Sequence, residues 1–295
     1  STKEWARENK KKWEDYWKND EAELVHFIGK DNIVFHCIIF PSMLRAHGEY
    51  ILPKNVPANE FLNLEGEKIS TSNNWAVWIH EYLEDFPDKE DVMRYVLTAN
   101  MPETKDSDFT WKDFQAKNNN ELVAIYGNFV NRVIVLINKY YTGEIPKPDL
   151  YTEEDEVIIN SVKMIRDKIS LTIEKFRFRE SNSEMIKIAR IGNKYLADNE
   201  PWKKIKNNPE RTKTILFISI QLVSALAYLS EPFLPFTSLK LKGILRIEKQ
   251  IEWKEILDSN IIESGHKINR ESFLFEKIED AEIYSQQQKL NTTKK

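Results

Sequence analysis

Apolar residues recur every three or four positions through most of the second half of the chain. This spacing predicts amphipathic helices, because residues three and four apart share one helix face. Pro209 suits a first helical turn, and Pro232 stops the helix that precedes it. The predicted helices are 114–141, 153–179, 183–197 and 209–229, with shorter ones near 237–245 and 279–290. Amphipathic helices of this length predict a helical bundle.

The first hundred residues carry shorter patterns. Residues 23–29 form an apolar strand candidate that ends in Gly29, and the residues after it repeat apolar side chains at helical spacing. Asp31 is placed to cap that helix and Gly48 to end it. Strand, tight turn and helix predict half of a nucleotide-binding α/β unit, where ligands lie beyond the carboxyl end of the strand.

Further short elements follow this unit. A strand is expected at 61–64, short helices at 75–82 and 89–98, and a polar connector at 101–108. The chain is therefore expected to be mainly α, with a partial Rossmann-type α/β segment followed by an all-helical bundle. The predicted domains are 1–66, 67–112 and 113–295.

Composition narrows the class of protein. The 295 residues are 31% charged and 41% apolar, which is typical of a globular chain with a sizeable core. Cys37 is the single cysteine, which excludes an internal disulfide framework and a Cys-rich zinc site and fits a reducing, cytoplasmic location. No metal site is implied. Because the chain starts with Ser1, we expect a fragment whose own start lies upstream.

The longest apolar run, 215–229, predicts a buried helix and no membrane partner. Ser219, Gln221 and Ser224 interrupt the run, which is too short and too polar for a membrane span.

Charge is uneven along the chain. The net charge is −4, yet residues 160–220 hold fourteen Lys and Arg against seven acidic residues. A basic face of this kind suits nucleic acid, although most charge runs are solvated helix faces.

The stretch EKISTSNN at 67–74 is the most unusual loop candidate. Lys68, Ser70 and Ser72 place one cation and two hydroxyls within five positions, a combination that suits an anion such as phosphate. Taken alone, a lysine beside serines is also a common surface loop.

The order of four motifs resembles the methionyl-tRNA synthetase family of class I aminoacyl-tRNA synthetases. The motifs are HFIGKDNIVFH at 26–36, FPSML at 40–44, NLEGEKISTS at 63–72 and NEPW at 199–202. The resemblance implies that the loop corresponds to the KMSKS signature, which holds ATP phosphates while the methionyl adenylate forms. Lys68 would then be the catalytic cation, and Ser70 and Ser72 would be donors. Thr71 stands where the family has a second lysine. The resemblance also implies that 1–66 is the C-terminal part of the Rossmann catalytic domain, that 67–112 holds this loop and a stem-contact segment, and that 113–295 is the anticodon-binding domain.

The same resemblance assigns the other ligand contacts of the α/β segment. Asp31 would lie on the ribose side of ATP, and the methionine pocket would be walled by Phe35, His36, Ile39 and Phe40. An aromatic and aliphatic wall with one polar group suits a thioether. ATP is the implied substrate, with Mg²⁺ expected alongside it and no zinc site in this chain.

The helical half resembles the family's anticodon-binding domain, which implies methionine tRNA with a CAU anticodon as partner. Trp202, followed by Lys203 and Lys204, has the aromatic and basic character that stacking on an unpaired base requires. On the facing helix the resemblance points to Lys139, but Val135 stands where the family has an asparagine. Asn131 and Asn138 are the candidates to replace that contact.

Two alternatives stay open at this point. A sister synthetase for isoleucine, valine, leucine or cysteine shares the architecture, and a non-catalytic helical module could bind RNA or protein. The family's other signature, the HIGH-type motif, is absent from the sequence. The chain by itself is therefore expected not to activate methionine.

Overall fold

The computed structural model describes residues 1–270 and 273–294. These residues form two compact units, one with residues 1–63 and 101–108 and the other with residues 64–100 and 109–295. Short strands are concentrated in the first unit and long helices in the second, so the predicted mainly α fold with a partial α/β segment is confirmed. The units divide the chain differently from the three predicted domains, because residues 64–100 group with the bundle.

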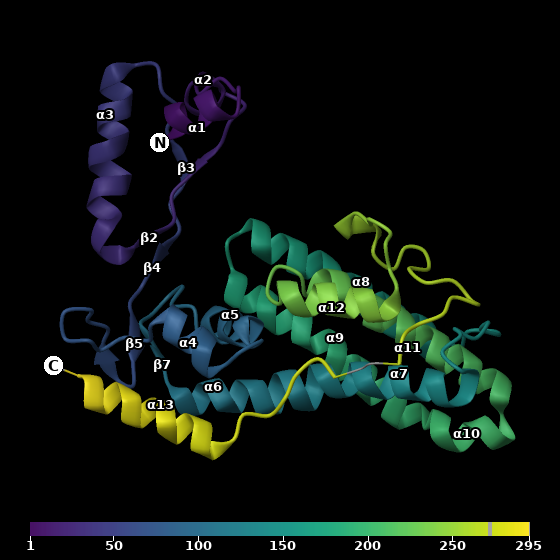
Figure 1. Cartoon of the computed structure of the whole chain (residues 1–295). Coiled ribbons are helices and arrows are strands. Elements are labelled where there is room, and N and C mark those ends of the chain that lie inside the picture. Colours follow the sequence, from purple (N-terminus) through teal and green to yellow (C-terminus); the bar gives the residue numbers. More distant parts are fainter. Residues whose placement is uncertain (271–272, 295) are drawn as a thin grey trace. The chain divides into compact units, whose positions relative to one another are not determined.

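A strand, helix, strand arrangement forms the centre of the first unit (Figure 1). Two strand pairs are parallel, β1 (Leu24–Val25) with β3 (Pro53–Asn55) and β2 (Ile28–Gly29) with β4 (Ala58–Asn59). Parallel strands need a crossover connection, which a helix supplies here. Its parts are η1 (Lys30–Asn32), the π-helical η2 (Phe35–Ile39) and α3 (Phe40–His47).

The ends of that crossover helix test two of the predictions. Gly48 has a left-handed φ of 87° and ends the helix as predicted. Asp31 makes no capping hydrogen bond, because the helical segment begins at Lys30 and Gly29 holds the cap position, so the predicted cap is wrong. The two N-terminal helices, α1 (Thr2–Glu8) and α2 (Glu14–Trp17), precede the first strand.

A three-stranded sheet has the order β6, β5, β7. Its strands are β5 (Leu62–Leu64), β6 (Glu67–Lys68) and β7 (Ser107–Phe109), so the predicted polar connector ends in a strand. Between β6 and β7 lie α4 (Ile79–Asp85) and α5 (Glu90–Ala99). Buried rings of Tyr82, Phe86, Trp111 and Phe114 pack together at centroid distances of 5.3–5.9 Å and form the core of this region.

The rest of the second unit is a helical bundle. One continuous helical rod runs through α6, η3 and α7, where η3 is a π-helical segment (Figure 1). The bundle consists of α6 (Trp111–Lys117), η3 (Asn118–Gly127), α7 (Asn128–Tyr141), α8 (Glu153–Glu174), α9 (Phe178–Asn199), α10 (Pro201–Asn207), α11 (Pro209–Leu229) and α12 (Pro235–Leu245). A short η4 (Trp253–Glu255) and a final α13 (Asp280–Thr293) follow, and α13 packs on α6.

Helix α11 is the centre of the bundle. Every residue from Thr214 to Leu229 is buried, which confirms the predicted buried helix. By length and composition alone, α11 and the rod Trp111–Tyr141 are apolar enough to cross a membrane, but 94% of the most apolar window of α11 is buried inside the protein. Burial of this extent is what a core helix shows.

A close crossing of α9 and α7 depends on Gly192. A Cβ atom at this position would lie 2.1 Å from Cζ of Phe129, which is fully buried. Since a packed core yields little, we expect Gly192→Ala to lower the free energy of unfolding by about 1–3 kcal/mol. Urea denaturation followed by circular dichroism measures the loss. Gly243→Ala, where a Cβ meets open space, is the control and should not be destabilised.

Candidate functional site

The KISTS loop, residues 68–72, is a tight and locally hydrogen-bonded turn. The backbones of Ser70 and Trp75 exchange two hydrogen bonds, N to O, of 2.9 and 2.8 Å. Inside this closure the hydroxyls of Ser70 and Ser72 lie 3.1 Å apart, and Ser70 Oγ accepts from the N–H of Asn73 at 3.3 Å. The loop therefore brings together the two hydroxyls that the sequence singled out.

A hairpin turn presents the loop to solvent. Glu65 and Gly66 have φ values of 49° and 81° and connect β5 to β6. Two successive residues with positive φ are the mark of the tight turn that matches strand twist. Lys68, at the end of β6, and Thr71 are both exposed. The loop thus holds a cation beside two hydroxyls at the surface of the second unit.

Trp75 anchors the loop to the interior. Its ring is buried, and its Nε1 donates to the carbonyl of Leu64 at 2.9 Å. Trp78 Nε1 donates to Asn74 Oδ1 at 2.9 Å. Both indoles fix the C-terminal side of the loop.

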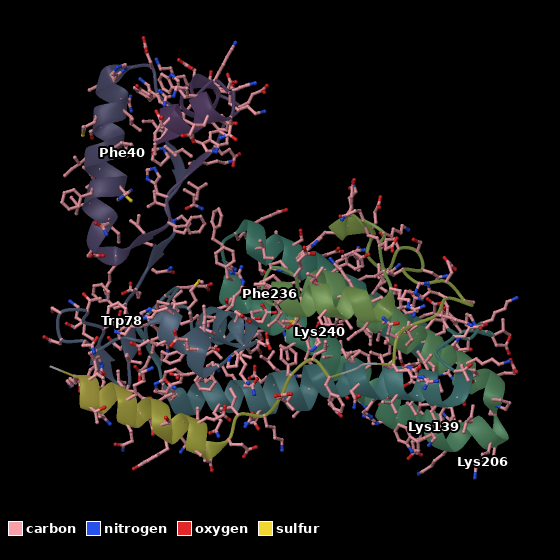
Figure 2. All side chains as sticks on the ribbon, in the orientation of Figure 1. Phe40, Trp78, Lys139, Lys206, Phe236 and Lys240 are labelled. Carbon is pink, nitrogen blue, oxygen red and sulfur yellow. The ribbon has the colours of Figure 1, made fainter. Side chains whose placement is uncertain are left out.

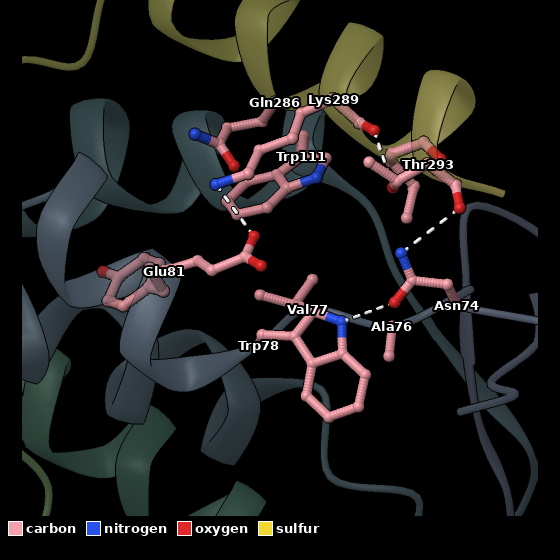
Figure 3. A pocket seen from close by; sticks show the side chains of 11 residues that line it. Asn74, Ala76, Val77, Trp78, Glu81, Trp111, Gln286, Lys289 and Thr293 are labelled. Atoms are coloured by element: carbon pink, nitrogen blue, oxygen red, sulfur yellow. Dashed lines mark hydrogen bonds and ion pairs between the residues drawn. The ribbon is translucent and has the colours of Figure 1, made fainter. Parts of the chain in front are cut away.

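Helix α13 contacts both sides of the loop, a feature that sequence reasoning missed. Asn74 Nδ2 donates to the carbonyl of Thr293 at 3.2 Å, and Lys294 Nζ pairs with the carboxylate of Glu67 at 2.7 Å (Figure 3 shows the Asn74 contact). Lys294 Nζ also lies 4.3 Å from the centroid of Trp75. The end of α13 therefore bridges the residues that flank the loop.

A small cavity separates α13 from α4. It holds about 30 Å³ and is lined by Trp78, Glu81, Trp111 and Lys289 among others (Figure 3). Lys289 spans it and pairs with Glu81 at 2.8 Å and with Asp85 at 2.9 Å. Trp111 Nε1 is buried and has no hydrogen-bond partner among the described residues. The volume suffices for a single water that would accept from it.

His36 and Phe40 share a face of the crossover helix and meet His26 of the first unit. The Nδ1 atoms of His36 and His26 are 3.2 Å apart, and the rings of His26 and Phe40 are 5.6 Å apart. Burial, with a smaller contribution from His36, lowers the pKa of His26. A neutral His26 leaves one ring nitrogen as an acceptor, so the pair can orient a polar ligand group.

Phe35 and Ile39 come one residue before His36 and Phe40, respectively, and face solvent. Phe35 is 57% exposed and Ile39 43%, and the neighbouring Val34, Ile38 and Met43 are exposed as well. Phe40 projects from α3 (Figure 2) and packs edge-to-face on Trp17 at 6.4 Å. The four predicted wall residues of the methionine pocket thus occupy adjacent positions on one helix and leave a contiguous apolar surface.

Asp31 lies at the start of that helix with its carboxylate exposed. A Cβ atom at residue 29 would come within 2.8 Å of Asp31 Oδ1, so glycine is what lets the carboxylate fold back over the strand end. The neighbouring Lys30 Nζ bonds to Asp106 at 2.8 Å and to Glu60 at 2.5 Å. Asp31 sits where a strand meets a helix, the place at which such folds bind nucleotides.

Trp202 lies in the first turn of α10 and is half-buried. The guanidinium carbon of Arg132, on α7, is 5.1 Å from the centroid of the Trp202 ring. Burial lowers the pKa of Arg132. Arg132 is a candidate that the sequence did not identify, because only the packing of α7 beside α9 and α10 brings the cation to this ring.

The other predicted anticodon residues lie along α7. Lys139 is exposed, with Nζ 5.5 Å from the ring centroid of Tyr140, and Figure 2 labels it together with Lys206 of α10. Val135 is 46% exposed and presents an apolar surface beside them. Asn131 is half-buried. Asn138 donates to the carbonyls of Ile134 and Asn269, contacts that favour a structural role for its amide.

A buried ion pair fixes the start of α10. Arg211 of α11 donates to both carboxylate oxygens of Asp155 on α8 and, at 3.1 Å, to Asn199 Oδ1 at the end of α9. Tyr195 donates to the same carboxylate. Burial alone would raise the pKa of Asp155, but the bonds from Arg211, Thr152 and Tyr195 outweigh it and hold the pKa below its usual value. Asn199 is three residues before Trp202, so this cluster sets where the tryptophan lies.

Comparison with known families accounts for nearly the whole chain. A model described as tRNA synthetases class I (M) matches residues 1–134, and one described as the anticodon binding domain of methionyl tRNA ligase matches residues 145–295. The first match defines the class, and the second defines the member of that class. The chain belongs to the methionyl-tRNA ligase family of class I aminoacyl-tRNA synthetases, which sets aside the sister synthetases and the non-catalytic module.

Curated relatives agree with this assignment. The chain is 61% identical over its full length to a methionine–tRNA ligase of Christiangramia forsetii and 59% identical to one of Flavobacterium psychrophilum. It spans 43% of the length of each.

Solved structures give the same fold. The apo methionyl-tRNA synthetase of Mycobacterium tuberculosis matches with a TM-score of 0.77 at 20% identity, over 88% of this chain and 50% of that one. The same enzyme in complex with methionyl-adenylate matches with a TM-score of 0.76 at 22% identity, over 87% of this chain and 50% of that one.

Proposed function

We propose that this chain is the part of a methionine–tRNA ligase that grips ATP during methionine activation and recognises the CAU anticodon of methionine tRNA. In this reaction the methionine carboxylate attacks the α-phosphorus of ATP, so that pyrophosphate leaves and methionyl adenylate forms. The methionyl group then passes to tRNA, and AMP leaves. The cluster of Arg132 on the face of Trp202, beside the basic residues of α10, is the observation that carries the tRNA assignment. A half-buried indole backed by a cation is a surface on which an unpaired base can stack.

In the ATP site, the chain's own groups act on phosphate charge. Lys68, Ser70 and Ser72 would donate to the phosphate oxygens on which charge grows as pyrophosphate leaves, and donors fixed before the reaction stabilise that charge best. Asp31 would accept from the ribose. Mg²⁺ would accompany ATP, bound mainly by the phosphates. We place the enzyme in the cytoplasm.

In the methionine site, the apolar helix face and the histidine pair would have different roles. Phe35, Ile39 and Phe40 would contact the side chain of methionine, and His36 would orient it. The wall formed by these residues is the exposed surface described above, so in the full-length enzyme it would be covered by substrate and by the rest of the catalytic domain.

The anticodon assignment predicts a selective loss in Trp202→Ala. A stacked base contributes roughly 1–3 kcal/mol, so binding of this chain to CAU tRNA should weaken by that amount, about 5- to 150-fold. Binding to a tRNA with an altered anticodon should barely change. Filter binding at fixed salt measures both affinities.

Lys203→Ala is the matched control, one residue along the same helix. Lys203 is exposed and pairs with Glu200 at 2.7 Å, so its loss should weaken both tRNAs alike and slightly. Equal losses for the two tRNAs in Trp202→Ala, with its circular dichroism unchanged, would count against anticodon stacking at this residue.

A further inference from the structure

Helix α8 carries a line of exposed apolar residues on the side opposite its packed face. The packed face contacts α9, α11 and η4, and its buried residues include Val162 and Ile169. Three large apolar side chains lie on the other side and are exposed, Val157 at 57%, Met164 at 73% and Leu171 at 49%. None of these three residues takes part in the sites described above.

The three exposed side chains are spaced by seven residues. Seven residues make nearly two turns of an α-helix, so side chains at this spacing lie along one line, as they do in the seam of a coiled coil. From Val157 to Leu171 this line is about 21 Å long at 1.5 Å per residue. Apolar residues scattered singly on a surface are ordinary, whereas a line of them indicates a surface that meets another helix.

The residues around this line are arranged symmetrically about Met164. With a rotation of about 100° per residue, seven side chains of α8 and its C-cap lie within about 40° of Met164. They follow one another at intervals of four, three, four, four, three and four positions, and all of them are exposed. This set, called the α8 stripe below, consists of Glu153, Val157, Asn160, Met164, Lys168, Leu171 and Lys175.

Two copies of the α8 stripe complement each other when the helices run antiparallel. A two-fold axis through Met164 places Val157 of one copy opposite Leu171 of the other. The same axis places Glu153 opposite Lys175, so both ends of the stripe meet a group of opposite charge. The side chains of Glu153 and Lys175 form no ion pair with other described residues, so both are available for this contact.

The charges of the α8 stripe favour this partner over others. A parallel pairing of two copies would place Glu153 opposite Glu153 and Lys175 opposite Lys175, which is destabilising. A uniformly acidic or basic helix would gain one ion pair and oppose a like charge at the other end. An acid at the start of a helix and a base at its end also suit the helix dipole, but the dipole does not explain the apolar residues between them.

We propose that the α8 stripe is a self-association surface through which two copies of this chain pair antiparallel about Met164. The interface is isologous, because each copy contributes the same residues. Lys168 Nζ pairs with Glu184 of its own chain at 2.6 Å, so the aliphatic stem of Lys168 faces Asn160 of the other copy. The inference does not depend on the proposed function, since none of these residues was placed in the ATP, methionine or anticodon sites.

The pairing should be weak and reversible. Seven residues a side is fewer than the roughly 20–30 of a standard interface, which is typical of a transient contact. We therefore expect a dissociation constant on the order of 10–100 µM. The dimer should be tighter at low salt, because its ion pairs lie at the exposed ends of the stripe. Sedimentation velocity of this chain from about 5 to about 500 µM measures the dissociation constant.

Met164→Glu tests the apolar centre of the interface. It sets two carboxylates against each other at the two-fold axis, so the dissociation constant should rise at least about tenfold. Leu239→Glu is the matched control, because Leu239 is 71% exposed on α12 and lies outside the α8 stripe. It should leave the dissociation constant unchanged. Circular dichroism confirms that both variants are folded, and equal losses in the two folded variants would overturn the proposal.

Exchange of the end charges tests the antiparallel orientation. Glu153→Lys and Lys175→Glu should each weaken the dimer several-fold, because each sets like charges opposite each other. The chain with both changes should return to the wild-type dissociation constant, since the two ends again carry opposite charges. If the charges acted only on their own helix through its dipole, the double variant would be the weakest of the three, which would overturn the pairing.

Disulfide trapping tests the register. Cys37 is the single cysteine, so Cys37→Ser provides a background without thiols. In this background Met164→Cys should be joined to a second copy by mild oxidation, because position 164 lies on the axis. Val157→Cys alone should not, since its counterpart is about 21 Å away and a disulfide needs Cα atoms within about 7 Å. A mixture of Val157→Cys and Leu171→Cys chains should form the mixed dimer.

Four outcomes would overturn the proposal, and none of them involves RNA. They are a chain that stays monomeric at about 500 µM in low salt, a dimer that Met164→Glu leaves intact, trapping of Val157→Cys with itself, and trapping in the full-length ligase that joins position 164 to another segment of the same molecule. Failure of the tRNA-binding tests above would remove the proposed function and leave this inference standing.

Discussion

Arg211→Ala should lower the free energy of unfolding of this chain by about 3–5 kcal/mol, the cost of leaving a buried charge without its partner. The Asp155 side chain has no exposed surface, and Arg211 contacts both of its oxygens. Because Arg211 also holds Asn199, the variant should lose order at the start of α10 and weaken CAU tRNA binding. Urea denaturation and filter binding measure the two effects.

The loss in the free energy of unfolding of Arg211→Ala should depend on pH. The pKa of Asp155 is lowered in the folded chain, so its contribution is complete above the unfolded pKa of about 3.9 and is lost as the pH falls through the folded pKa. Without Arg211, burial remains and favours the protonated acid. The difference between the wild type and Arg211→Ala should therefore narrow as the pH falls from 7 towards 4.

Lys213→Ala is the matched control for that loss. Lys213 is on the same helix, two residues further, and pairs with Glu210 at 2.7 Å in a partly exposed position. Pairs of this kind contribute about 0–1 kcal/mol. If Arg211→Ala and Lys213→Ala lowered the free energy of unfolding by similar amounts, the buried Asp155 pair would contribute no more to stability than a surface ion pair.

Lys68→Ala should slow methionine-dependent pyrophosphate exchange by about 10²-fold or more in the full-length ligase that contains this chain. Removal of one donor to charge that develops in a transition state costs about 10²–10³ in kcat. The KM for methionine should change little, because Lys68 would act on phosphate charge and not on the amino acid.

Thr71→Lys provides the comparison for that experiment. Thr71 is exposed in the same loop, so a second lysine there should be tolerated and should maintain or raise the exchange rate. A Lys68→Ala enzyme with a raised KM for methionine and an unchanged kcat would refute the phosphate role of the loop.

The strongest helical patterns predicted the fold well. The helix 209–229 was predicted with its observed bounds, because proline sets its start and nearly every side chain is buried. The predicted 153–179 overran α8 by five residues, since Phe176 has a left-handed φ of 59° that no glycine signals. Helix α10 was not predicted, because its seven residues contain only two large apolar side chains, Trp202 and Ile205, too few to show a helical period.

The contacts of the candidate site were harder to predict than the helices, because the residues that touch there are distant in sequence. Residues of the KISTS loop and the Phe35 to Phe40 face are close in sequence, so periodicity and motif placed them correctly on a loop and a helix. The contacts of Arg132 with Trp202 and of Lys294 with Glu67 join residues 70 and 227 positions apart. No local pattern reports such pairs, because they depend on how whole helices pack.

The rod from Trp111 to Tyr141 is long enough that a small tilt at one end becomes a larger displacement at the other. Its 31 residues span about 46 Å at 1.5 Å per residue. Trp111 is buried at one end, where it lines the cavity between α13 and α4, and Arg132 and Lys139 lie towards the other end, on α7. A tilt of about 5° at one end would displace the far end by about 4 Å over this length. The ten-residue π segment Asn118–Gly127 lies between the two ends of the rod, and an interruption of this kind is often found at functional sites.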